Sequence, residues 1–248
     1  MKKFSPFILL IVLMMFSIWG CSDEDDNGTG ITEPPYTEDE FDYFISVVNI
    51  PDRGMFSINL INYQGEPIET VTLTLNGVDI PMNWVDSLYS WVGNVELVVN
   101  SNYNFDLTVN DSAWDFNLLV PPTPTVNWPM QIDFSEDWEL SWNLNPDIDS
   151  QIQTMIAISF DYEYNIVDDE VALIESSDRE FEFPGGWLTA GEMLYILTMA
   201  ETNYFMDTTL LAVLVNQETA LYETLRSGYK IVSPKFPELQ ESIIRAIN

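Results

Sequence analysis

The sequence predicts an all-β protein with two β-sandwich domains in tandem and a short C-terminal helix. From residue 41 onward, apolar and polar residues alternate in short runs, and turn residues recur about every 8–12 positions, which is typical of β-sandwiches. Apolar residues make up 46% of the chain and aromatic residues 13%, which is enough to build packed cores. The roughly 210 residues in this part of the chain suit one large or two ordinary domains.

The first domain is predicted over residues 39–121. Its strongest hairpin signal is Asn76-Gly77, because both residue types accept the positive φ that a two-residue hairpin turn requires. Apolar residues alternate with threonines just before this turn. The predicted strands of this domain are 44–48, 55–61, 71–75, 88–92, 95–99, 103–109 and 114–120.

A proline-rich stretch, Pro121-Pro122-Thr123-Pro124, follows these strands. Proline pairs stiffen a linker and cannot donate to a sheet, so the domain boundary is placed here. The second domain is therefore predicted over residues 122–248.

The second domain opens with its clearest strand. Large apolar residues alternate with polar ones, so one face of this strand is expected in a core; these apolar residues are Trp138, Leu140, Trp142 and Leu144. Further strands are predicted over 155–164, 179–183, 194–199 and 208–215. Residues 217–226 fit either a short helix or an elongated hairpin arm. After Pro237, a terminal helix is expected to pack on this domain, or alternatively to bind a partner.

Both domains resemble immunoglobulin-like sandwiches, and the second is similar to a fibronectin type III domain. That family carries a Trp on an early strand, which Trp142 would supply here. It also has a corner in which a tyrosine hydroxyl fastens a loop, and Leu188 with Tyr195 would form that corner. The resemblance implies a fold and says nothing about a ligand.

The N-terminus has the composition of a secretory signal over residues 1–20. Two lysines precede an apolar run that is too short to cross a bilayer comfortably, and Gly20 stands before Cys21. The alternative is an uncleaved membrane anchor. Cys21 is the single cysteine of the chain, so a disulfide is excluded. The residues around Gly20-Cys21 resemble the lipobox of bacterial lipoproteins, which implies a cut before Cys21 and a lipid anchor on it.

An acidic run follows Cys21 directly and consists of Ser22, Asp23, Glu24, Asp25 and Asp26. It resembles the signal that sends some lipoproteins to the outer face of the outer membrane, and a solvated spacer is the alternative. Residues 21–38 are predicted to be a flexible tether in either case. The expected location is therefore the outer membrane, facing the cell exterior.

Composition excludes several functions. Without residues 1–20, six Lys and Arg residues stand against forty Asp and Glu, a formal net charge of −34. Such a surface repels nucleic acid and anionic lipid, so the membrane contact is expected through lipid on Cys21 alone. The chain has no histidine, which removes Ser-His-Asp and Cys-His catalysis and histidine metal ligands. We expect neither an enzyme nor a cofactor, and assign no catalytic or metal-binding residue.

Candidate contacts with a ligand are three tryptophans near turns: Trp84, Trp114 and Trp187. An exposed indole can stack on a sugar, although burial in a core is its commoner use. The acidic clusters 147–149 and 168–170 lack the spacing of a specific calcium loop, so calcium is at most a weak partner.

The sequence thus predicts a non-catalytic, lipid-anchored envelope protein that serves binding, adhesion or assembly, with a glycan or an envelope protein as partner. The alternative is a carbohydrate-active enzyme that uses a carboxylate pair, or a glycan-binding lipoprotein with exposed Trp.

Overall fold

The computed structural model describes residues 41–50, 55–63, 68–85, 88–93, 97–161, 166–189, 194–225 and 228–231. Every regular element within these ranges is a β-strand, and the strands form sheets in a sandwich-like arrangement, so the all-β prediction is confirmed. The signal segment, Cys21, the acidic run, the tether and the predicted C-terminal helix lie outside the described residues.

The largest sheet has ten strands. Its main order is β13-β12-β15-β16-β1-β2-β6-β5, and β17 pairs with β16 and β10 beside this path. The strands are β1 (Tyr43–Ile50), β2 (Met55–Asn62), β5 (Asn83–Val85), β6 (Leu88–Gly93), β10 (Gln131–Ile132), β12 (Ile152–Phe160), β13 (Ile166–Ile174), β15 (Leu194–Met206), β16 (Leu210–Leu225) and β17 (Gly228–Ile231).

Two smaller sheets complete the described fold. The four-stranded sheet has the order β4-β3-β7-β8 and the three-stranded sheet the order β14-β11-β9. Their strands are β3 (Val71–Leu75), β4 (Val78–Ile80), β7 (Asn102–Val109), β8 (Ser112–Leu119), β9 (Thr123–Val126), β11 (Trp138–Asn145) and β14 (Glu180–Phe183).

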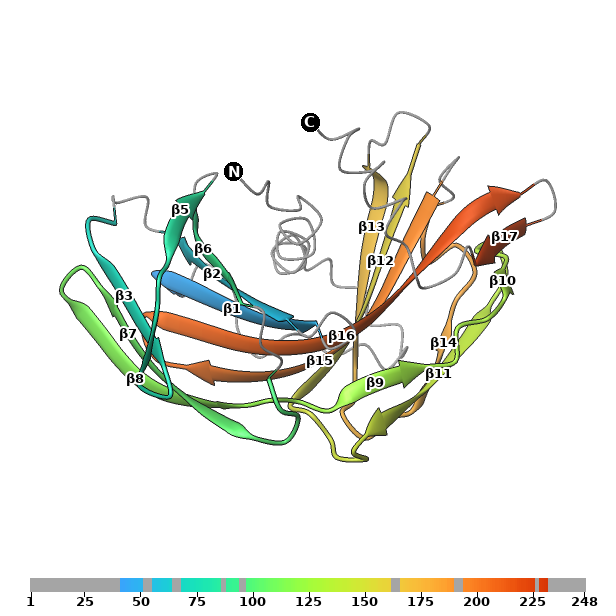
Figure 1. Cartoon of the computed structure of the whole chain (residues 1–248). Helices are drawn as coiled ribbons and strands as arrows, with labels where there is room; N and C mark the ends of the chain where they lie inside the picture. The colour runs from blue at the N-terminus through green and yellow to red at the C-terminus, as the bar shows by residue number, and fades with distance from the viewer. Residues whose placement is uncertain are drawn as a thin grey trace.

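Strands β15 and β16 are the longest strands of the ten-stranded sheet, with 13 and 16 residues. Figure 1 shows them extending from the four-stranded sheet at one end toward the three-stranded sheet at the other. Residues 210–216 of β16 pair in parallel with 43–49 of β1, and residues 222–225 pair with β17. The first described strand of the chain therefore lies beside one of the last.

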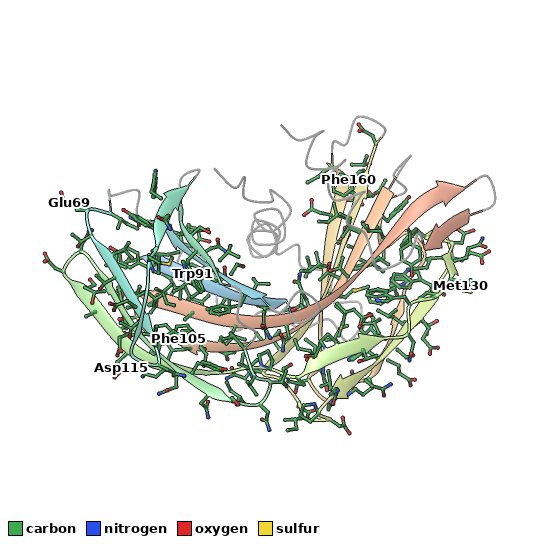
Figure 2. All side chains as sticks on the ribbon, viewed as in Figure 1. Glu69, Trp91, Phe105, Asp115, Met130 and Phe160 are labelled. Carbon is green, nitrogen blue, oxygen red and sulfur yellow. The ribbon has the colours of Figure 1, made fainter. Side chains whose placement is uncertain are left out.

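The first core cluster lies between the four-stranded sheet and the part of the ten-stranded sheet that faces it. Its buried side chains come from alternate positions of β1, β2, β3, β7 and β8, as period-two patterning requires. Phe105, which is labelled in Figure 2, lies within this cluster. Its ring stacks on that of Phe116 with 5.3 Å between centroids. Three further members, Leu210, Ala212 and Leu214, belong to β16. A strand from the second half of the chain thus completes the core of the first half.

The second core cluster packs the three-stranded sheet against β12, β15 and β16. The predicted alternation of β11 is confirmed, because Trp138, Leu140, Trp142 and Leu144 are all buried in this cluster. The two residues of the predicted fibronectin-like corner, Leu188 and Tyr195, are also buried in it. The resemblance to that family stays a prediction.

The proline-rich stretch is part of the packed structure. Pro121, Pro122 and Pro124 are buried, and Pro124 lies within β9, where it pairs with Leu144 of β11. β9 is an edge strand of its sheet, and an edge position tolerates a residue that has no N–H to donate. The division into domains 39–121 and 122–248 stays a prediction, and strands from both ranges share the ten-stranded sheet.

Four predicted elements differ from the structure. In the predicted strand 95–99, residues 97–98 are irregular and 99–100 form a turn; Leu97 bonds the Asn49 side chain through its N–H and C=O, in place of a ladder. The predicted strands 194–199 and 208–215 are parts of the longer β15 and β16. Residues 217–225 continue β16, so the helix alternative is wrong for them and the hairpin-arm alternative holds.

Candidate binding surface

Trp84 is the most exposed of the three candidate tryptophans. It lies on β5, the edge strand of the ten-stranded sheet, and 61% of the residue is exposed. Its register partner on β6 is Tyr89, and the two rings meet edge to face with 5.1 Å between centroids. Edge-to-face contact is a favoured aromatic geometry, so Tyr89 fixes the position of the exposed indole.

The surroundings of Trp84 place it at the rim of the first core. Tyr89 pairs in turn with Leu60 of β2, so all three side chains stand on the core side of the sheet. Leu60 is fully buried and Tyr89 is half-buried against the same cluster. The Tyr89 hydroxyl donates to the Ile68 carbonyl oxygen at 3.2 Å, which anchors the ring below the indole. Trp84 therefore stands exposed at the rim of the first core.

The other two candidate tryptophans are half-buried against the cores. Trp114 on β8 packs on the first cluster and contacts the Tyr43 ring edge to face at 5.5 Å. Trp187 packs on the second cluster, 4.7 Å from the Phe183 ring and 6.5 Å from the Trp138 ring. The three tryptophans do not form one joint platform in this fold, because Trp84 and Trp187 border different cores.

The acidic clusters have partners within the protein. Asp149 and Asp147 pair with Arg179, at 2.6 Å and 3.6 Å from its Nη2. The Asp168 carboxylate accepts the Thr189 N–H at 2.6 Å. Burial, with the charges of its two acidic neighbours, raises the pKa of Glu170. The described ranges contain no group of three or more acidic or sulfur side chains placed to hold a metal ion, and a weak calcium interaction stays a prediction.

A row of buried polar side chains crosses the middle of the ten-stranded sheet, and the sequence analysis missed it. Successive register pairs join Gln153 on β12, Glu201 on β15, Asn216 on β16 and Asn49 on β1. Each of the four is 0% exposed. Register partners point to the same face of a sheet, so the row faces the smaller sheets and the connecting segments.

Each member of this polar row bonds a residue outside its own strand. Gln153 accepts the indole N–H of Trp142 at 3.0 Å, and Glu201 accepts the Ser150 hydroxyl at 2.5 Å. Asn49 bonds the backbone of Leu97. Buried polar groups need such partners, so the row fixes where the connecting segments lie on the sheet.

Residues 119–126, called the linker below, are held on the ten-stranded sheet by several side-chain hydrogen bonds. Asn203 and Asn216 donate to backbone carbonyl oxygens of residues 119–126, and Glu218 accepts a backbone N–H there, at 2.6–3.0 Å. Glu218 also accepts the indole N–H of Trp128 at 2.9 Å. Residues 195–203 of β15 are all buried, so this strand has no apolar-polar alternation against which Glu201 would stand out in the sequence.

Glu201 has the most perturbed acidity in this region. Burial raises its pKa to about 8; the Ser150 hydrogen bond and the Arg179 charge oppose that rise, and the Asp149 charge adds to it. Because the side chain is fully buried, a substrate does not reach it. A raised pKa alone often marks a catalytic acid, but it also arises in buried structural networks.

Comparisons with known proteins give no family for this chain. No family model matches it, and no curated protein matches it. Among solved structures, dimeric latent PorU from Porphyromonas gingivalis is similar to 79% of this chain at 13% identity, with a TM-score of 0.23. This chain spans 21% of that PorU chain, and no functional statement rests on the likeness. Within the described ranges, no helix is long and apolar enough to span a bilayer.

Proposed function

We propose that this chain is a non-catalytic lipoprotein, anchored in a bacterial outer membrane through lipid on Cys21, that binds a glycan at the cell exterior. The Trp84 edge surface, defined as Trp84 with Tyr89 beneath it, is the proposed contact. The observation that supports it most is the 61% exposure of a Trp at a sheet edge whose ring packs on Tyr89. Aromatic anchors of this kind supply contact area with little loss of side-chain entropy.

The charge of the protein narrows the ligand class. A mature chain with a formal net charge of −34 repels anionic polymers, so the glycan is expected to be neutral or cationic. The apolar face of a sugar ring can stack on the indole without any charged contact.

Two features favour a binding role over catalysis. The chain has no histidine and a single cysteine, which removes the commonest general bases and nucleophiles. Glu201, whose pKa is near neutrality, lies fully buried and 2.5 Å from the Ser150 hydroxyl, away from solvent. A glycosidase needs its carboxylates to face a substrate.

A glycan array with the full-length protein in detergent tests this function. We expect binding to neutral or cationic glycans, and Trp84→Ala is expected to weaken it about tenfold or more. Met130→Ala is the matched control, since Met130 is 73% exposed on the segment between β9 and β10 (Figure 2). Binding that survives Trp84→Ala unchanged, or an array with no bound glycan, contradicts the proposal.

A further inference from the structure

Glu201 and Asn216 are buried neighbours whose side-chain oxygens lack hydrogen-bond donors. They are register partners on β15 and β16, so their side chains stand next to each other on one face of the sheet. Glu201 Oε1 and Asn216 Oδ1 are both buried and have no hydrogen-bond partner. Two oxygens that only accept cannot satisfy one another, and each unpaired buried acceptor destabilises the fold.

The orientation of Asn216 is fixed by its other contact. Its Nδ2 donates to the Pro121 carbonyl oxygen at 2.6 Å and lies 3.5 Å from Thr123 Oγ1. A flipped amide would turn its oxygen toward the Pro121 oxygen, so Oδ1 must be the atom left without a donor. The missing proton has to come from another group.

The Ser150 hydroxyl, which contacts the other carboxyl oxygen of Glu201, also faces more acceptors than it has protons. Its hydroxyl oxygen lies 2.9 Å from the Ile152 carbonyl oxygen and 2.5 Å from Glu201 Oε2. One hydroxyl has one proton, so it can donate to only one of these two acceptors. If Glu201 were ionised, the Ser150 hydroxyl would supply the only proton for this group of oxygens. The group consists of the oxygens of Ser150, Ile152, Glu201 and Asn216.

The charged groups around Glu201 do not supply a free counter-ion. Arg179 is the nearby cation, and it already pairs with Asp149 and Asp147. On β16, two positions beyond Asn216, Glu218 adds a second carboxylate on the same face. On β12 the register partner is the neutral Gln153. Burial raises the pKa of Glu201 to about 8, in agreement with this arrangement.

We propose that Glu201 stays protonated inside the folded protein, and that this proton lies on Oε1 and is donated to Asn216 Oδ1, while Oε2 accepts the Ser150 hydroxyl proton. The proton thereby supports the Asn216 side chain, whose Nδ2 holds the linker on the sheet through its bond to the Pro121 carbonyl oxygen. Loss of the proton in alkaline solution leaves a buried charge beside the lone pair of Asn216 Oδ1. The linker bond then weakens, so attachment of the linker depends on pH.

Carboxyl spectroscopy on the full-length protein tests the protonation state directly. We expect the infrared signal of a protonated carboxylic acid at pH 6.5, lost on Glu201→Gln and kept in the control Glu139→Gln. Glu139 lies at an exposed position of β11, away from the buried polar row. Absence of the signal in the wild-type protein, or its persistence in Glu201→Gln, overturns the proposal. The wild-type spectrum decides the question even if the variant does not fold.

Hydrogen exchange of the backbone tests the consequence for the linker. Between pH 7 and pH 9, amides of residues 119–126 in the wild-type protein are expected to lose protection at least tenfold relative to Glu201→Gln measured at the same pH. Comparison at equal pH removes the intrinsic dependence of exchange on hydroxide. Equal protection in both proteins at pH 9 contradicts the proposed coupling.

Discussion

Glu201→Gln changes how the stability of the protein depends on pH. Glutamine keeps the size of the side chain, can accept the Ser150 hydroxyl proton, and can donate an N–H to Asn216 Oδ1. It therefore mimics the protonated acid at every pH. The wild-type carboxyl has a pKa of about 8 in the fold against an ordinary value of 4.5, so folding takes up a proton between these values.

The direction and size of the effect follow from this difference. Because the pKa in the folded state is raised, the stabilisation is complete below pH 4.5 and is lost as the pH rises through about 8. Once the carboxyl is ionised in the unfolded chain, the free energy of unfolding falls by about 1.4 kcal/mol per pH unit. For this one group, the loss between pH 5 and pH 7 is about 2.5 kcal/mol. Glu201→Gln lacks this loss.

Urea unfolding followed by tryptophan fluorescence at pH 5, 6, 7 and 8 measures the difference. The free energy of unfolding of Glu201→Gln relative to wild type should rise by about 2.5 kcal/mol from pH 5 to pH 7. Glu139→Gln makes the same chemical change at an exposed position and should run parallel to wild type. Parallel curves for all three proteins would refute the reasoning, because Glu201 would then titrate as an ordinary carboxyl.

Four substitutions test other parts of the structure by urea unfolding. Trp142→Phe removes the N–H that Gln153 accepts and leaves a gap in the second core, so a loss of about 2–4 kcal/mol is expected. Asn216→Leu should cost about 2–3 kcal/mol and expose the linker to limited proteolysis. Gly77→Ala should cost about 1 kcal/mol, because the turn needs φ of +74°. Trp84→Ala should change stability by less than about 0.5 kcal/mol, since the indole is mostly exposed. A gain in stability for any of the first three, or a large loss for the fourth, would contradict the packing described.

Local patterning was sufficient to predict most strands. Alternation predicted β1, β2, β3, β6, β7, β8 and β11 within a few residues, and Asn76-Gly77 predicted the β3–β4 hairpin. Both turn residues have positive φ, as that hairpin requires. These features depend on neighbours in sequence, so a single sequence contains them.

Long-range pairing could not be predicted in the same way. The parallel pairing of β1 with β16 joins residues 43–49 to 210–216, and no local pattern specifies such a partner. The short strands β5, β10 and β17 were missed because two to four residues give too little alternation to recognise. Pro124 suggested a break, but an edge strand accommodates a proline.

The candidate site was only partly visible in the sequence. Trp84, Trp114 and Trp187 were selected equally because all three lie near turns. Their exposure, however, depends on how closely each indole packs on a core, which the sequence does not specify. The buried polar row was not foreseen, because Glu201 and Asn216 become neighbours only through the β15–β16 register. In so acidic a chain, one more Glu carries no signal by itself.

The central claim is that the chain is a lipid-anchored protein exposed on the cell surface. Intact mass and protease accessibility on whole cells test it most directly, with Cys21→Ala as the matched variant. We expect a mature N-terminus at Cys21 with added lipid mass, cleavage by external protease, and release from the membrane fraction in Cys21→Ala. An unlipidated wild-type chain, or one that external protease cannot reach while the outer membrane is intact, would contradict the account.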